Sequence, residues 1–558
     1  MTNRGRHGVA LPVAATLAIL VLVGAAGFVL TRGTGASPAT ALPPPRFVEE
    51  TATAGIDQTY AGAAPFEVGG GVAVFDCNGD GKPDIYIAGG SGTAALYRND
   101  SLIGGALRFT RLPDPATDLT GVTGAYPIDI DGDGQADLVV LRSGEATLLR
   151  GLGGCRFERA NAQWSFDAGT GFWTAFSATW EGSAARPTLA LGRYLRLDAS
   201  GAPTQDCADN VLLRPAAGET AYSPPIALAP GYCSLSMLFS DWDGSGRRDL
   251  RVSNDSNYYD PANGEEQLWR IASGEPPRLY TDADGWVRVQ LEGMGIASYD
   301  LTGSGYPDVF LTSQGDNRLQ RLTSGPAQPT YRDMGAKLGV NAAQPFTGGD
   351  IQPSTAWHPE FQDVNNDGFV DLFISKGNVD AQPGFAVKDP SNLLLGQSDG
   401  TFKESADVAG ILSFERGRGA ALADFNLDGM LDLVEVNYGA PVRVWRNVGT
   451  GDAAQPSPMG GWLALRLDQP GANRGAIGAW IEAKVGDLTM RRELTVGGGH
   501  ESGQLGWVHF GLGGSSAAQI RVTWPDGETG PWIAVNANEF AVIERGASQA
   551  TPWRPSGS

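Results

Sequence analysis

Six acidic nonapeptides in this chain have the residue types and spacing to bind a hard cation. Each follows the pattern D-x-[DNTS]-x-[DS]-G-x-x-D, with oxygen-bearing side chains at positions 1, 3, 5 and 9. Such oxygens are typical Ca²⁺ ligands, and glycine at position 6 permits the sharp turn that brings them together. The predicted ligands are Asp76, Asn78, Asp80 and Asp84 in loop 1; Asp129, Asp131, Asp133 and Asp137 in loop 2; Asp241, Asp243, Ser245 and Asp249 in loop 4; Asp300, Thr302, Ser304 and Asp308 in loop 5; Asp363, Asn365, Asp367 and Asp371 in loop 6; and Asp424, Asn426, Asp428 and Asp432 in loop 7.

The loops begin like EF-hand loops but continue differently. An EF-hand has a bidentate Glu at position 12, followed by a helix, whereas only Glu435 is acidic at this position here. Apolar or β-branched runs such as Asp371-Leu-Phe-Ile follow most of the loops, which predicts a strand on each side of each loop. The alternative is a set of Asp/Gly turns without metal. That alternative would leave several carboxylates facing one another with no cation between them.

The loops recur at a regular interval, about 53 to 63 residues, which indicates a repeat architecture. A second motif, seen as Leu96-Tyr-Arg-Asn99 and Val444-Trp-Arg-Asn447, follows the loops, so that each unit has room for about four strands. One gap, between Asp137 and Asp241, has twice the usual length. Residues 175–194 in its middle keep a strand–loop–strand pattern without the ligands. We therefore predict an all-β fold with a seven-bladed β-propeller, in which blade 3 has lost its metal loop.

These repeats resemble the FG-GAP (VCBS) repeats that build the seven-bladed propeller of the integrin α head. The C-terminal residues resemble an ASPIC/UnbV domain in four motifs, and the combination is similar to bacterial members of the cartilage acidic protein 1 family. The resemblance implies a propeller over 46–455, a small β-rich domain over 456–545, a tail at 546–558 and up to six Ca²⁺ ions. Ser245, Thr302 and Ser304 depart from the acidic pattern, so the sequence leaves the Ca²⁺ occupancy of loops 4 and 5 open. The C-terminal motifs are Asn473-Arg-Gly-Ala-Ile-Gly478, Gly497-Gly-Gly-His-Glu-Ser502, His509-Phe-Gly-Leu-Gly513 and Val522-Thr-Trp-Pro-Asp-Gly527.

The composition argues against a nucleic-acid partner. The 558 residues carry a formal net charge of −21, and much of the acidity lies in the six loops. The sequence contains nothing that resembles a basic patch. We interpret the acidity as a sign of metal loading; an acidic solvated surface is the alternative.

The N-terminal 45 residues predict export. Basic residues at Arg4 and Arg6 precede an uncharged apolar run from Val9 to Leu30, long enough to span a bilayer as a helix. An uncleaved signal anchor is the favoured prediction, and cleavage near Ala36-Ser-Pro-Ala39 is the alternative. We expect a single-pass membrane protein with a periplasmic or cell-surface domain, or otherwise a secreted protein. Residues 31–45 are predicted to form a linker.

Four cysteines fit an exported chain with disulfides. Cys207 and Cys233 are the stronger predicted pair, and Cys77 and Cys155 the weaker one; free buried thiols are the alternative.

No catalytic motif is evident, so we predict a protein that is not an enzyme. The chain has four histidines, and His358, His500 and His509 are expected to pack in the structure. The turn containing His500, Glu501 and Ser502 is predicted to be a structural hairpin. A catalytic grouping of these three residues is not expected, because adjacent residues on a strand point to opposite faces and form a relay poorly. The favoured function is recognition of a protein or polysaccharide outside the cytoplasm, with a role as accessory subunit of a membrane complex as a variant. The alternatives are an extracytoplasmic enzyme acting on glycans or other polymers, and a purely structural surface protein.

Overall fold

The computed structural model describes residues 1–2, 40–216, 221–255 and 264–555, and residues 40–558 form one compact unit. The predicted helix at residues 9–30 and most of the linker lie outside the described residues. The described residues form an all-β fold with only short helices, for example α2 (Thr51–Ala54), α4 (Gly335–Leu338) and α5 (Ala406–Ala409). None of these helices has the length and apolar character needed to cross a membrane.

The strands follow a four-strand antiparallel order that recurs along the chain. In each repeat the first strand runs into the predicted loop and the second strand returns from it, as the sequence predicted. The repeats consist of β2 (Val72–Phe75), β3 (Asp84–Ile87), β5 (Ala95–Asn99) and β6 (Phe109–Arg111); β7 (Thr120–Ile128), β8 (Asp137–Glu145), β9 (Thr147–Gly151) and β10 (Phe157–Arg159); β11 (Thr170–Thr179), β12 (Thr188–Arg193), β15 (Asn210–Leu213) and β16 (Ile226–Leu228); β17 (Ser234–Ser240), β18 (Asp249–Asn254), β19 (Gln267–Arg270) and β20 (Arg278–Leu279); β21 (Gly293–Tyr299), β22 (Asp308–Ser313), β23 (Arg318–Leu322) and β24 (Tyr331–Asp333); β25 (Ala356–Gln362), β26 (Asp371–Lys376), β27 (Asn392–Gly396) and β28 (Phe402–Glu404); and β29 (Gly417–Ala423), β30 (Asp432–Asn437), β31 (Arg443–Asn447) and β1 (Phe47–Glu49).

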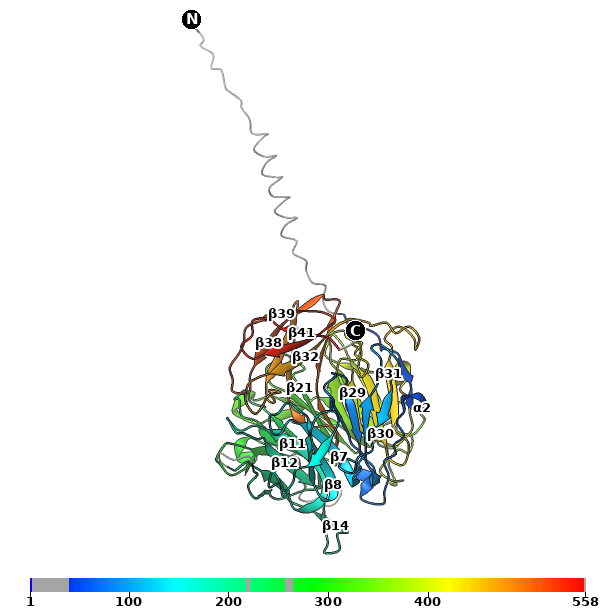
Figure 1. The fold of residues 1–558 in the computed structure, drawn as a ribbon. Helices are drawn as coiled ribbons and strands as arrows, with labels where there is room; N and C mark the ends of the chain where they lie inside the picture. Colours follow the sequence, from blue (N-terminus) through cyan, green and yellow to red (C-terminus); the bar gives the residue numbers. More distant parts are fainter. Residues whose placement is uncertain (3–39, 217–220, 256–263, 556–558) are drawn as a thin grey trace. The chain divides into compact units, whose positions relative to one another are not determined.

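The last of these repeats takes its fourth strand from the other end of the sequence. Strand β1 pairs antiparallel with β31, with Val48 opposite Arg446, and α2 lies beside β31 (Figure 1). The first strands of successive repeats contact one another in chain order from β2 to β29, and β29 contacts β2. The arrangement is therefore propeller-like, and segments from both ends of the repeat region meet in it.

Burial falls from the first strand of a repeat to the fourth. Strands β2 and β17 are buried along their whole length, whereas β6 and β10 each bury one residue of three. The first strands use small or branched residues, such as Val72-Ala-Val-Phe75, that pack between neighbouring sheets. Apolar residues of adjacent repeats share clusters, for example Leu422 and Phe373. Burial of apolar side chains between the sheets therefore stabilises the repeat region.

The C-terminal residues form a separate pair of sheets. One sheet has the order β37 (Val508–Gly513), β32 (Gly461–Asp468), β40 (Glu539–Glu544), β41 (Thr551–Trp553), and the other has the order β34 (Leu488–Glu493), β33 (Trp480–Val485), β38 (Ala517–Thr523), β39 (Ile533–Asn536). Leu463, Ile481 and Phe510 belong to one buried cluster to which both sheets contribute. Strand β41 lies beyond residue 545, so the sheet extends into the segment that we predicted as a tail.

Residues 496–505 leave this domain and pair with the repeats. Strand β35 (Val496–Gly497) pairs with β11 and β17, and β36 (Gly503–Leu505) runs parallel to β2. Between them Ala125 N donates to Glu501 O, and Gly499 N donates to Ile296 O. The segment therefore touches the first strands of several repeats, where these strands approach one another. The prediction of a local hairpin at Gly497–Ser502 was wrong, because strands distant in sequence satisfy its backbone groups.

Candidate metal centres

The first aspartate of each loop shapes the turn with its carboxylate. In loop 1, Asp76 Oδ2 accepts a hydrogen bond from Gly81 N at 2.8 Å, and Asp76 Oδ1 accepts one from Gly79 N at 2.7 Å. The same bond to the position 6 amide occurs in the other five loops. The position 6 glycines have φ between 82° and 91°, a conformation that a side chain would strain. The loop therefore forms as the sequence predicted.

In loops 1, 2, 6 and 7, the position 9 aspartate ties the loop to the third strand through main-chain amides. Asp432 Oδ2 accepts from Phe425 N at 3.1 Å, and Asp432 Oδ1 accepts from Asn447 N at 2.8 Å. Asp84, Asp137 and Asp371 make the equivalent pair of bonds. Each oxygen thus accepts one amide and keeps a lone pair for a further partner.

Burial is the main reason why these position 9 carboxylates resist ionisation. It raises the pKa of Asp84 to about 7 and that of Asp137 to about 8. Burial, and then the neighbouring carboxylates, raise the pKa values of Asp371 and Asp432 well above the usual value. A cation among these groups would offset both causes, because it favours the charged form.

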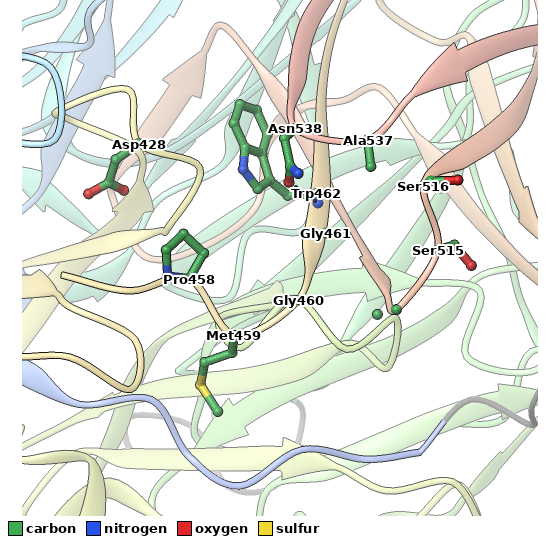
Figure 2. Close-up of a pocket in the computed structure, with 12 residues that line it drawn as sticks. Asp428, Pro458, Met459, Gly460, Gly461, Trp462, Ser515, Ser516, Ala537 and Asn538 are labelled. Carbon is green, nitrogen blue, oxygen red and sulfur yellow. Dashed lines mark hydrogen bonds between the residues drawn. The ribbon is translucent and has the colours of Figure 1, made fainter.

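Loops 6 and 7 have the chemistry that a hard cation requires. Within the part of the chain that the structure describes, no Lys or Arg forms an ion pair with any of their six aspartates. The buried Asn426 Oδ1 and Asp428 Oδ2 have no hydrogen-bond partner among the described residues. Asp428 also lines a cavity of about 660 Å³ between loop 7 and the C-terminal domain (Figure 2). The residues of loop 7 therefore fit an oxygen-coordinated ion.

Loop 2 combines converging carboxylates with partial neutralisation, and loop 1 also has positive side chains beside its aspartates. Asp129, Asp131 and Asp137 bring carboxylate oxygens within 4.8 Å of one another. Arg150 lies 2.7 Å from Asp131 and 2.9 Å from Asp133. In loop 1, Lys82 lies 3.4 Å from Asp80, and Arg466 of the C-terminal domain lies 3.5 Å from Asp76.

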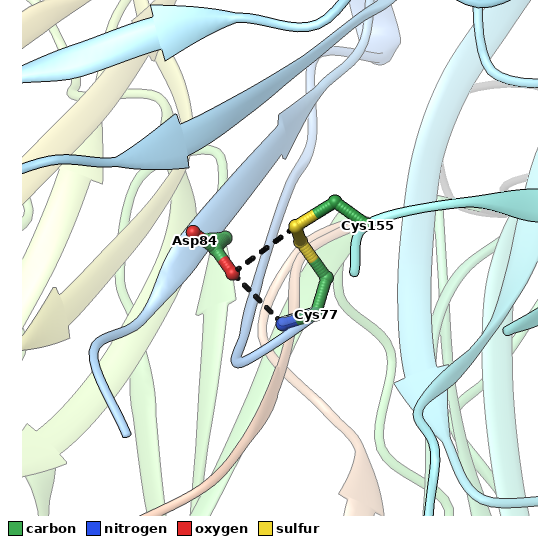
Figure 3. Close-up of side chains that lie close together, drawn as sticks. All are labelled: Cys77, Asp84 and Cys155. Carbon is green, nitrogen blue, oxygen red and sulfur yellow. Dashed lines mark hydrogen bonds between the residues drawn. A yellow bond between two sulfur atoms is a disulfide. The ribbon is translucent and has the colours of Figure 1, made fainter. Parts of the chain in front are cut away.

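A disulfide adjoins loop 1. Cys77 and Cys155 are bonded, and Asp84 Oδ2 lies 3.7 Å from Cys155 Sγ (Figure 3). Because both sulfurs are in the disulfide, neither supplies a thiolate ligand. Cys207 and Cys233 form a second disulfide, so both predicted pairs are present and the alternative of free thiols was wrong.

Loops 4 and 5 hold guanidinium groups among their aspartates. Arg247 Nε lies 2.9 Å from Asp249 Oδ1, and Arg247 Nη2 lies 3.1 Å from Asp249 Oδ2 and 3.3 Å from Asp243 Oδ2. In loop 5, Arg321 binds both oxygens of Asp308 at 2.7 and 3.1 Å. In each of these loops an arginine therefore pairs with the position 9 aspartate, which the ligand pattern alone had not revealed.

The third repeat has the expected strand–loop–strand form without acidic ligands. Strands β11 and β12 pair antiparallel, with Thr179 opposite Thr188. Thr188 stands where the other loops have their last aspartate, and Arg186 packs over the Trp164 ring at 4.4 Å. Glu181, the acidic residue of this segment, is paired with Arg214 at 2.7 Å.

The C-terminal domain packs against the loops. Trp507 Nε1 donates to Gly81 O at 3.1 Å in loop 1, and Arg248 Nη1 of loop 4 donates to Pro525 O at 2.8 Å. In loop 7, a Cβ added at Gly429 would collide with the Trp462 ring. The end of the sheets that carries the loops is therefore covered by the C-terminal domain.

His500, Glu501 and Ser502 each bind a main-chain group of the repeats. His500 Nε2 lies 2.8 Å from Val68 O, Glu501 Oε2 accepts from Gly70 N, and Ser502 Oγ accepts from Val72 N. Burial lowers the pKa of His500 to about 3 and raises that of Glu501. His358 is buried, and its Nδ1 accepts from His500 N at 3.0 Å. These contacts give the four side chains structural roles.

Comparisons with known proteins agree with the motifs. The FG-GAP-like repeat family matches residues 76–140 and 363–435, and the ASPIC and UnbV family matches residues 469–550. Cartilage acidic protein 1 of Xenopus tropicalis is 26% identical over 263 residues, which is 42% of this chain and 37% of the relative. The human protein of the same name is 25% identical over 234 residues, or 39% of this chain and 32% of the relative. The chain thus matches well under half the length of these relatives.

Solved structures show only distant likeness. BBS1N in complex with ARL6DN aligns over 75% of this chain and 100% of its own, at 10% identity and a TM-score of 0.40. The rhamnogalacturonan lyase YesW aligns over 71% of this chain and 77% of its own, at 11% identity and a TM-score of 0.35. Scores this low carry no information on function. The chain therefore contains FG-GAP-like repeats and an ASPIC/UnbV domain, and its relatives named cartilage acidic protein 1 share modest sequence identity with it.

Proposed function

We propose that this protein is a Ca²⁺-stabilised, seven-bladed β-propeller that serves as a recognition scaffold outside the cytoplasm. The blade count is supported by the seven four-strand repeats and by the contacts between their first strands, which run from β2 to β29 and return to β2. Strand β1 would close the ring by completing the last blade. The N-terminal segment at 9–30 would hold the propeller at the membrane.

Calcium is proposed for the loops because their side chains supply the oxygen ligands that this ion prefers. A bound ion would neutralise the buried aspartates and hold the first two strands of a blade together. In loop 7 the groups that would hold it are Asp424, Asn426, Asp428 and Asp432, of which Asn426 Oδ1 and Asp428 Oδ2 are unpartnered among the described residues.

The observation that carries the recognition proposal is an exposed apolar group at the end of the sheets remote from the loops. This apolar patch consists of Ile351, Val387 and Phe414, which are 78%, 70% and 42% exposed. Val387 N donates to Asp350, the neighbour of Ile351, and a Cβ at Gly348 would meet the Phe414 ring, so the three residues lie in adjoining segments. Exposed apolar side chains that gather in this way are typical of a protein-binding surface.

The location of the patch follows from the strand directions. Ile351 and Phe414 precede the first strands β25 and β29, and Val387 follows the second strand β26. Both strand ends point away from the metal loops, which the C-terminal domain covers. The patch is therefore on the end of the propeller that remains open to a partner, and we favour a protein partner over a polysaccharide.

One further feature supports an extracytoplasmic protein. Both pairs of cysteines are in disulfides, which persist in oxidising compartments. We propose no catalytic role, because a glycan-acting enzyme would need a polar pocket on the propeller axis, and residues 496–505 pair with the first strands there.

A mild-detergent pull-down of the tagged full-length protein, in Ca²⁺ buffer and in parallel with EDTA, tests the proposal. We expect a stoichiometric protein partner that is retained in Ca²⁺ and is lost both in EDTA and from the double variant Ile351→Glu/Val387→Glu. Val408→Glu is the matched control, because Val408 is also 72% exposed but belongs to α5 and is not one of the three patch residues. A partner retained by the double variant would overturn the assignment of the patch, and capture of a glycan instead would favour the polysaccharide alternative.

A further inference from the structure

We infer that an arginine guanidinium takes the place of the calcium ion in loops 4 and 5, so that the chain binds four calcium ions and not six. The inference rests on the proposed function, in which the loops bind Ca²⁺. It assigns Arg247 and Arg321 as internal cations of two blades, and it limits metal binding to loops 1, 2, 6 and 7.

In loop 4 the position 9 carboxylate has no capacity left for an ion. Asp249 accepts five hydrogen bonds: two from Arg247, and one each from Ile271 N at 3.0 Å, Trp242 Nε1 at 2.9 Å and Tyr280 Oη at 2.8 Å. A carboxylate offers about four lone-pair sites. Asp249 is buried, and a buried carboxylate requires a positive partner. The guanidinium of Arg247 is this partner, in the place of a metal ion.

Arg247 is at position 7 of loop 4, and from there its guanidinium reaches two of the predicted ligands. Arg247 stands two residues before Asp249, and its Nη2 also reaches Asp243 at 3.3 Å, so that it bridges positions 3 and 9. The bidentate geometry at Asp249 is the strong form of this contact, because two parallel N–H donors match the two carboxylate oxygens. An ion that bound Asp243 and Asp249 together would have to displace this side chain.

Loop 5 reaches the same result with a different arginine. Arg321 lies on the third strand, β23, and its Nε and Nη2 bind the two oxygens of the buried Asp308. Positions 3 and 5 are Thr302 and Ser304, so the loop carries only the charges of Asp300 and Asp308. One guanidinium therefore neutralises half of the loop, and the remaining side-chain ligands are weak ones for Ca²⁺.

The contrast with loop 7 shows what an ion-binding loop retains. Asp432 accepts only main-chain amides, one on each oxygen, and no described Lys or Arg pairs with Asp424, Asp428 or Asp432. Loop 6 has the same arrangement around Asp371. These two loops carry three carboxylates each, with no positive side chain bound to them in the described structure.

Loop 2 also has a nearby arginine, but it leaves the position 9 ligand free. Arg150 binds Asp131 and Asp133, whereas Asp129 and Asp137 make no ion pair among the described residues. The loop has four aspartates against one guanidinium. An excess of negative charge therefore remains for a divalent ion.

Counting the ions bound to the full-length protein tests the inference. The protein is exchanged into Ca²⁺ buffer, desalted and measured by native mass spectrometry and by elemental analysis. We expect four calcium ions per chain, four again in Asp249→Asn and three in the matched variant Asp432→Asn. Asp308→Asn is a second variant that should keep all four ions, in case Asp249→Asn does not fold.

Arg247→Gln provides the converse test. Removing the guanidinium leaves Asp243 and Asp249 without their internal cation, so we expect the calcium count to rise by one. Five or six ions in the unaltered protein, or a loss of one ion in Asp249→Asn, would overturn the inference and leave the proposed function standing. A count that does not rise in Arg247→Gln would also overturn it. No bound calcium in any variant would instead overturn the proposal that the loops bind Ca²⁺.

Discussion

His509 of β37 and Asn366 of loop 6 are joined by a hydrogen bond in which His509 Nε2 lies 2.6 Å from Asn366 Oδ1. Asn366 Nδ2 donates to Gly429 O of loop 7 at 2.9 Å, so Asn366 Oδ1 is free to accept and His509 Nε2 must donate. Burial lowers the pKa of His509 to about 3, and the imidazole is therefore neutral. One histidine thus connects the C-terminal domain to loops 6 and 7.

Replacing this histidine should weaken the connection. We expect His509→Ala to lower the free energy of unfolding by about 1–3 kcal/mol, because it leaves the buried Asn366 Oδ1 without a donor. His509→Gln, whose amide can still donate, should lose less. Urea unfolding of both variants in excess Ca²⁺ gives the comparison, and equal losses would show that packing of the ring matters more than the hydrogen bond.

Chelation should destabilise the protein. Ions that bind only the folded state add about 2.7 kcal/mol per site when the free ion is at 100 times its Kd. We therefore expect EDTA to lower Tm, and added Ca²⁺ to restore it, in differential scanning fluorimetry. EDTA already saturated with Ca²⁺ serves as the control. An unchanged Tm in EDTA would contradict the assignment of calcium to the loops.

Asp255 should make stability fall as pH rises. Burial raises the pKa of Asp255 to about 8, although Tyr194 Oη donates to Asp255 Oδ2 at 2.7 Å. The unfolded pKa is about 3.9, so between these values the folded state binds more protons than the unfolded state. This group therefore costs stability as pH rises from about 4 to about 8, by up to about 1.4 kcal/mol for each pH unit.

The variant Asp255→Asn isolates this contribution. Asparagine can still accept a hydrogen bond from Tyr194 but does not ionise. We therefore expect the free energy of unfolding of the variant, relative to that of the unaltered protein, to increase as pH rises from 5 to 8. Urea unfolding across this pH range checks it, with Tyr194→Phe as a control that keeps the titrating carboxyl. A constant difference between Asp255→Asn and the unaltered protein at all pH values would refute the prediction.

Space around residues 496–505 is so limited that a single methyl group should disturb it. A Cβ at Gly124 would lie 2.2 Å from Glu501 O, a main-chain atom that cannot rotate away. We expect Gly124→Ala to cost about 1–3 kcal/mol or more. Gly506→Ala is the control, because a Cβ there meets nothing within 4 Å. Equal thermal stability of the two variants would show that the segment is more loosely held than its contacts indicate.

The two disulfides should contribute unequally. Cys77 and Cys155 are 78 residues apart, and Cys207 and Cys233 are 26 apart. On the chain-entropy account, the longer loop should contribute about 1 kcal/mol more. The double serine variants Cys77→Ser/Cys155→Ser and Cys207→Ser/Cys233→Ser, compared in guanidinium unfolding, test this. A larger loss from the second pair would mean that local contacts, and not loop length, set the difference.

Local patterns predicted much of this structure. The acidic nonapeptides and the apolar runs beside them predicted strand–loop–strand units, because both features lie within about twenty residues. The strand–loop–strand form of residues 175–194 and the pairing of Cys207 with Cys233 were likewise evident from short segments.

What the sequence did not show depends on distant partners. Strand β1 pairs with β31, and residues 496–505 pair with β2, β11 and β17, across separations that no local pattern encodes. Arg247 is two residues before Asp249 in the sequence, but the nonapeptide pattern considers only positions 1, 3, 5 and 9. Because Arg247 is at position 7, the pattern did not predict its role. Arg321 reaches Asp308 from another strand, and only the fold brings them together.

The pairing of β1 with β31 has a consequence for the order of folding. Ribosomes make Phe47–Glu49 long before Arg443–Asn447, so the last repeat cannot gain its fourth strand until synthesis of the repeats is complete. Contacts between residues so far apart form slowly, because the intervening chain must first be ordered. Until then the early repeats would present unpaired strand edges, which favour aggregation. The newly made chain is therefore expected to depend on a holding factor until β1 and β31 pair.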